Sequence, residues 1–151
     1  MSDIETNLNA VRRRIEAARE RSPYHQAVTL VAVTKFHPRD VGETRVQEME
    51  EKFRMGPLPV RWHLQGHLQK NKVKKAVAIA DLIHSGDSLD ILKEIGRRAG
   101  EIGKRQDVLL EFNISGEESK HGLDPKDFDA IAAAAGAVEG IRVTGLMCMA
   151  P

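Results

Sequence analysis

The sequence has little of several features that would mark a specialised class of protein. Its one cysteine, Cys148, excludes an internal disulfide and a cysteine-rich zinc site. Its 23 Lys and Arg residues are balanced by 22 Asp and Glu residues, which removes the positive charge expected of a nucleic-acid binder or a polybasic membrane protein. Only 4% of its residues are aromatic, so a core must be built mostly from Val, Ile, Leu and Ala.

Long apolar runs are also absent. No stretch of 18 apolar residues exists, and the amino-terminal segment has no apolar signal region, so we expect no membrane span, no secretory signal and a cytoplasmic location. With 41% hydrophobic and 30% charged residues, the 151-residue chain has the composition of a soluble globular protein. We expect one domain covering residues 1–151, with a core that needs no disulfide or metal.

Apolar and amphipathic segments alternate along the chain. A capping box of Ser2 and Glu5 opens an amino-terminal helix, and further helical periodicity follows. The alternation predicts βαβ units and a parallel sheet, which fits both a doubly wound sheet and a (β/α) barrel. The five predicted strands are 28–34, 61–65, 81–85, 108–114 and 142–147, and helices are expected near 46–53, 68–80, 92–102 and 125–135.

Candidate functional residues gather where the predicted strands end. In parallel α/β folds the chemistry is found at the carboxyl ends of strands. Lys35 is the sharpest signal, because a lysine that continues a buried strand can lose its charge and attack a carbonyl group. It could equally be a strand-end lysine that reaches solvent. The other residues at such ends are His63, Gln65, His84, Ser85, Asn113, Met147 and Met149.

Three polar groupings allow a functional and a structural interpretation. His63 and His67 are four residues apart, but a strand-to-loop break separates them and no third ligand has an obvious spacing, so we predict no metal site. The lysines of residues 70–75 could meet phosphate or RNA, but a solvated helix face is the simpler interpretation, and we predict no nucleic-acid partner. Asn113 with residues 120–122 could hold a ligand or form an ordinary turn.

Several stretches, taken in order, resemble one family. The chain is similar to the pyridoxal phosphate homeostasis proteins, which share the barrel of the alanine racemase N-terminal domain. The resemblance covers nearly the whole chain. The stretches that carry it are LVAVTK (30–35), GETRVQE (42–48), WHLQGHLQKNKVK (62–74), HS-D (84–87), NISGEESKHG (113–122) and GLMCMAP (145–151).

The resemblance implies a fold and a cofactor. The expected fold is α/β, a parallel (β/α) TIM-barrel-like domain of the alanine racemase N-terminal type. The expected cofactor is pyridoxal 5′-phosphate, held as a Schiff base on Lys35, the residue that matches the family's lysine at the end of the first strand. Asn113 and Lys120 match a family stretch near the cofactor, and His63 and Met147 match strand-end positions that line the pocket.

The sequence departs from the family pattern in ways that shape these expectations. The segment between Pro38 and Gly42 is short, and the family's last strands and helices have no counterpart after Pro151, so we expect an incomplete barrel. In the family, the phosphate-binding segments and the arginine facing the pyridine nitrogen lie in that last part. Thr44 and His37 stand where the family pattern has an asparagine and a lysine.

These considerations predict a protein of vitamin B6 homeostasis that binds pyridoxal phosphate without efficient turnover. The alternatives are a cofactor-free interaction or structural protein of the same fold, and a racemase-like enzyme that uses the cofactor. Amino or keto acids are possible ligands. An open barrel edge would be a liability, so we also expect self-association through it.

Overall fold

The computed structural model describes residues 3–31, 42–56, 60–117 and 121–149, and it forms two compact units, Met1–Ala32 and Val33–Pro151. The predicted residues Lys35, His37 and Lys120 lie outside the described residues. Among the helices of the described part, none is long and apolar enough to cross a membrane.

The first unit consists of one helix, α1 (Asp3–Arg21), and the segment that follows it. The Arg19 guanidinium pairs with Glu16 and also donates to the His25 carbonyl at 3.3 Å, which ties the turn after the helix to its last turn. Residues 28–31 form no strand, and Val28 and Leu30 are 53% and 44% exposed. The prediction of a strand over 28–34 is therefore wrong for its described part, because residues 28–31 take part in no described ladder of hydrogen bonds.

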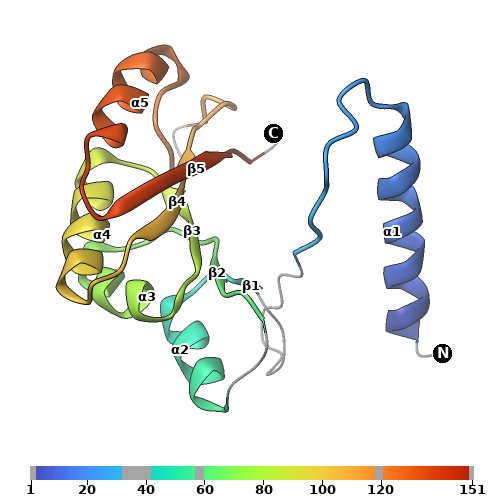
Figure 1. The fold of residues 1–151 in the computed structure, drawn as a ribbon, viewed down its shortest axis with the longest axis horizontal. Coiled ribbons are helices and arrows are strands. Elements are labelled where there is room, and N and C mark those ends of the chain that lie inside the picture. The colour runs from blue at the N-terminus through green and yellow to red at the C-terminus, as the bar shows by residue number, and fades with distance from the viewer. Residues whose placement is uncertain (1–2, 32–41, 57–59, 118–120, 150–151) are drawn as a thin grey trace. The chain divides into compact units, whose positions relative to one another are not determined.

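The second unit contains a five-stranded parallel sheet whose strands lie in chain order (Figure 1). The register pairs His63 with Leu82, Leu82 with Asp107 and Asp107 with Arg142. The second to fifth strands of the sheet match the predicted strands 61–65, 81–85, 108–114 and 142–147 within a few residues, whereas the first strand of the sheet was not predicted. The bounds of the strands are β1 (Gly42–Glu43), β2 (His63–Leu64), β3 (Leu82–Gly86), β4 (Gln106–Glu111) and β5 (Ile141–Met147).

Helices alternate with these strands, as the periodicity predicts. Ser88 caps one of them, since its Oγ accepts a hydrogen bond from the Ile91 N–H at 3.3 Å, and Asp124 Oδ1 caps the 3-10 turn before another by accepting one from the Lys126 N–H at 2.9 Å. The helices are α2 (Val46–Arg54), α3 (Val73–Ile79), α4 (Leu89–Glu101) and α5 (Phe128–Gly136), with 3-10 turns η1 (Lys70–Lys72) and η2 (Pro125–Asp127).

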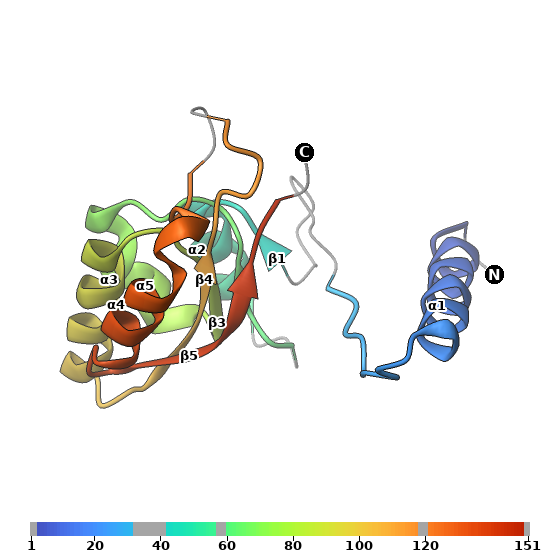
Figure 2. The same ribbon diagram turned by 90° about the horizontal axis from the view of Figure 1, so that it is seen from above.

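The helices of the second unit cover one face of the sheet (Figures 1 and 2). Parallel strands in simple chain order, joined by crossovers of one hand, place every connecting helix on the same side. A doubly wound sheet would reverse its order and place helices on both faces, so the barrel-type alternative is correct. Among the described strands, β1 and β5 each have a single neighbour, which confirms an incomplete barrel.

The hydrophobic core lies between the sheet and its helices. Alternate strand residues such as Leu64, Ile83 and Val108 are fully buried against apolar side chains of the helices. Glu43 of β1 is also buried on this side, and its carboxylate pairs with the buried Lys52 ammonium of α2. Burial raises the pKa of Glu43, while Lys52 opposes that shift.

Helix α4 contains two glycines that differ in what surrounds them. A Cβ added to Gly96 would lie 2.1 Å from the Glu139 carbonyl oxygen, whereas one added to Gly100 would meet nothing within 4 Å. Gly140, with φ of +78°, lies against the backbone of Gly96. The turn that leads into β5 therefore fits against α4 only where α4 has no side chain.

The first prediction compares these two positions. Gly96→Ala should lower the free energy of unfolding by about 1–3 kcal/mol, because backbone atoms must move to admit the methyl group. Gly100→Ala should raise it by about 0.5–1 kcal/mol, since alanine is the better helix former and the site is open. Urea unfolding of the parent and both variants measures the difference. Equal stability of the two variants would contradict this close approach.

Candidate functional site

Two histidines lie on the face of the sheet that the helices leave uncovered. His63 of β2 and His84 of β3 alternate with residues that face the core, and each is half-buried. The His63 Nδ1 and His84 Nε2 atoms lie 2.9 Å apart, so one imidazole donates a hydrogen bond to the other. In a barrel this face lines the interior.

Burial keeps this pair uncharged at neutral pH. It lowers the pKa of His84 to about 4, and the neighbouring His63 adds to that shift. Burial also lowers the pKa of His63, and the Arg61 guanidinium does the same. The two rings therefore form a neutral polar patch that can donate or accept a hydrogen bond.

Asn113 and Met147 come together at the carboxyl ends of the neighbouring strands β4 and β5. The Phe112 N–H donates to the Met147 carbonyl at 2.9 Å, which aligns the two strand ends. The Asn113 Oδ1 atom accepts hydrogen bonds from Ser115 Oγ at 3.0 Å and from the Gly116 N–H at 3.1 Å. Asn113 thus shapes the loop after β4, which supports the turn interpretation of this stretch.

The loop that begins at Asn113 folds back onto the end of β4. The Leu123 N–H donates to the Glu111 carbonyl at 2.8 Å, and the Asn113 N–H donates to the Leu123 carbonyl at 3.0 Å. Gly122 has φ of +133°, and a Cβ there would lie 2.6 Å from the Asn113 nitrogen. This close return places His121 beside the strand ends.

His121 lies near three residues at or just after the ends of β2, β3 and β4. We call these four residues, His67, Asp87, Glu111 and His121, the mouth cluster. The His67 and His121 rings are stacked, with centroids 3.9 Å apart and planes 12° apart. The His67 Nδ1 and Asp87 Oδ2 atoms are 2.7 Å apart. Burial raises the pKa of Glu111, Asp87 adds to the rise, and His67 opposes it.

Sequence reasoning missed the mouth cluster as a unit. It compared His67 only with His63, because those two share a short spacing. The real neighbours of His67 are 20 and 54 positions further along the chain, at Asp87 and His121. The HS-D and KHG stretches contain both residues, yet nothing in their spacing shows that they meet.

The structure thus separates the predicted site residues into two places. His63 lies beside His84 within the sheet, whereas Asn113 and Met147 mark the edge formed by the carboxyl ends of β4 and β5. Lys35 and Lys120, which complete the predicted set, are outside the described residues.

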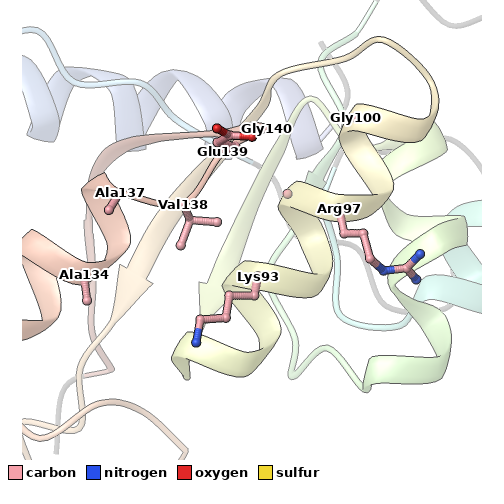
Figure 3. A pocket seen from close by; sticks show the side chains of 9 residues that line it. Lys93, Arg97, Gly100, Ala134, Ala137, Val138, Glu139 and Gly140 are labelled. Carbon is pink, nitrogen blue, oxygen red and sulfur yellow. The ribbon is translucent and has the colours of Figure 1, made fainter.

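A groove on the helical layer lies elsewhere (Figure 3). It is formed by α4, the end of α5 and the turn before β5, and Lys93, Arg97, Val138 and Gly140 are among its lining residues. Gly140 immediately precedes β5, so this groove opens toward the amino end of that strand. It is distinct from the edge where the candidate residues gather.

Comparison with known proteins identifies the family. The family model of the alanine racemase N-terminal domain matches residues 6–151. The pyridoxal phosphate homeostasis protein of Escherichia coli K12 is 35% identical over 169 residues, covering 99% of this chain and 71% of that protein. The protein of the same name from Aquifex aeolicus is 34% identical over 158 residues, covering 95% of this chain and 69% of that protein. The chain belongs to the pyridoxal phosphate homeostasis protein family.

A solved structure agrees with this family membership. PipY of Synechococcus elongatus PCC7942 with PLP bound has a TM-score of 0.74 and 33% sequence identity, covering 92% of this chain and 70% of that protein. The family resemblance and the parallel barrel-type fold predicted from the sequence are therefore both confirmed.

The histidine pair generates the second prediction. An unfolded histidine titrates near pH ~6.5, so between that pH and about 4 the unfolded chain binds a proton that folded His84 excludes. The stability contributed by neutral His84 is complete above this window and is lost as the pH falls through it. The urea midpoint should therefore fall less between pH 7 and pH 5 in His84→Gln than in the parent.

The exposed His25 provides the control for this measurement. His25→Gln should retain the pH dependence of the parent, since His25 belongs to the other unit. An unchanged slope in His84→Gln would contradict a buried neutral His84.

Proposed function

We propose that this chain binds pyridoxal 5′-phosphate at the carboxyl ends of its parallel strands and serves vitamin B6 homeostasis. Membership of a family that includes PipY, a protein solved with PLP bound, carries this proposal. The fold supports it, because the carboxyl edge of a parallel barrel is where such folds bind ligands. We also propose that residues 1–151 act as one barrel-type domain in the cytoplasm.

The described residues fit an aromatic, hydroxyl-bearing ring. Met147 offers a half-buried thioether, which packs favourably against ring edges. Asn113 lies at the neighbouring strand end, where its side chain holds the loop that follows β4. The His63–His84 pair adds hydrogen-bonding capacity without charge. The position of Asn113 and Met147 at one edge of the sheet supports them as residues of the cofactor pocket. His63, which lies within the sheet, is assigned to the pocket on its match to the family pattern.

Lys35 is the residue to which we assign covalent attachment, on its match to the family motif. When bound, the cofactor supplies an electrophilic aldehyde carbon and an electron-withdrawing ring. The Lys35 amine must be uncharged to attack that carbon. Lys120 is the second lysine of the proposed pocket.

We infer a carrier or regulatory role rather than efficient turnover. Racemisation needs one positioned group to remove a Cα proton and another to return a proton to the opposite face. Lys35 is a candidate for one face, whereas Lys120 and His63 are only conjectural for the other. Misplacement of a catalytic group by about 1 Å costs orders of magnitude in rate.

Two further ligands follow from the same proposal. Amino or keto acids would bind in the pocket because they can react with the cofactor. A second copy of the chain would meet the outer edge of β5, where Leu146 is 58% exposed.

The third prediction concerns the attachment site. The chain mixed with pyridoxal phosphate, reduced with borohydride and digested should yield a modified peptide that contains Lys35. Lys35→Ala should lower the visible absorbance of bound cofactor to that of free cofactor, whereas Lys120→Ala should retain most of it. Equal absorbance in Lys35→Ala and the parent, with modification at Lys120, would move the site to that lysine.

The fourth prediction concerns turnover. With pyridoxal phosphate present, the chain should racemise L-alanine no faster than the free cofactor does, because racemisation needs a second acid–base group and neither Lys120 nor His63 is assigned to the opposite face. Chiral chromatography of the amino acid over time measures this. A rate well above that background, lost in Lys35→Ala, would establish the racemase-like alternative instead.

A further inference from the structure

The mouth cluster brings three potential metal ligands together from three different strand ends. His67 follows β2, Asp87 follows β3 and His121 lies in the loop after β4. One ligand atom of each residue lies within 4.8 Å of the others. Two imidazoles and a carboxylate that converge from separate loops match the ligand set of zinc sites with three protein ligands.

The charges around this cluster favour a cation. The Asp87 side chain is only 6% exposed, and Glu111 is 7% exposed at the end of the adjacent strand. Two desolvated carboxylates beside each other repel an anion such as phosphate and attract a positive ion.

The ligand types decide which class of cation fits. Magnesium and calcium prefer sites made wholly of oxygen ligands, whereas imidazole nitrogen suits zinc, nickel and copper. We propose that the mouth cluster binds a divalent transition-metal ion of the zinc type, with His67, Asp87 and His121 as its protein ligands. Glu111 lies beside this ligand set and adds negative charge.

Binding at this site replaces a hydrogen bond with two metal–ligand bonds. His67 Nδ1 and Asp87 Oδ2 lie 2.7 Å apart, and to ligate the ion through Nδ1 a neutral His67 carries its ring proton on Nε2 while Asp87 binds as the carboxylate. Tetrahedral zinc with bonds of about 2.0–2.1 Å holds neighbouring ligand atoms about 3.3 Å apart, so these two atoms must separate slightly. The His67 side chain is 41% exposed and has room to tilt out of its stack with His121. Water completes the coordination.

The experiment uses the full chain without a histidine tag, treated with a chelator and free of pyridoxal phosphate. Zinc is titrated against a chromophoric competitor, and cobalt is followed by its visible absorbance as a probe of tetrahedral geometry. We expect one zinc equivalent per chain, and no displacement of that zinc by magnesium at a large excess. Because no cofactor is present, failure of this proposal is separate from failure of the proposed function.

Matched histidine variants make the test specific. His67→Ala, His121→Ala and Asp87→Asn should each weaken zinc binding by about tenfold or more, since each removes one ligand. His25→Ala removes an exposed histidine from the other unit and should bind as the parent does. Saturating zinc should raise the melting temperature of the parent and of His25→Ala, but not that of His121→Ala.

Circular dichroism of each variant without metal establishes that it is folded, and Asp87→Asn conserves the shape of the side chain it replaces. Equal zinc affinity in the parent and in folded His67→Ala or His121→Ala would overturn the proposal. Octahedral rather than tetrahedral cobalt absorbance, unchanged by these variants, would also overturn it.

Discussion

One-sided burial is the constraint on which the second unit depends. Its strands run parallel in chain order, so each helix returns over the same face and buries its apolar side there. The core therefore consists of one layer of helices against one face of the sheet. The opposite face is left to polar side chains, including the His63–His84 pair and the Asp107–Arg142 ion pair.

Each face of the sheet pairs a carboxylate with a cationic side chain. On the helical side, the Glu43 carboxylate is matched by the Lys52 ammonium. On the opposite face, the Arg142 guanidinium binds Asp107 through two nitrogens at 2.6 and 2.7 Å, and this holds the pKa of Asp107 below its usual value. At the carboxyl edge, Asp87 meets a histidine instead of a lysine or arginine.

Close backbone approaches hold the strand-end loops in position. A Cβ on Gly66 would lie 2.0 Å from the Thr44 carbonyl oxygen, so the segments that follow β1 and β2 touch through their main chains. Gly122 likewise lets the loop after β4 pack against the backbone of Asn113, and it has a backbone conformation that residues with side chains rarely adopt. His67 and His121 are the chain neighbours of these glycines, and their rings stack because the two loops are held in these positions.

The sequence by itself determined the class of fold, the family and most of the elements. Periodicity depends on which residues must be buried, and burial is encoded locally, so β2 to β5 and their helices were predictable to within a few residues. Caps such as Asp124 were predictable for the same reason, because a cap bonds to its own helix. The match of Lys35 to a family motif also required only the sequence.

Only the tertiary structure decided which of the remaining residues meet. Periodicity could not choose between single and double winding, because both alternate parallel strands with helices along the chain, and the order of the strands resolved it. The run at 28–31 has strand composition, yet a strand also needs a partner. His67, Asp87 and His121 come together because parallel strands deliver their carboxyl ends to one edge, and a contact across that edge leaves no regular spacing in the sequence.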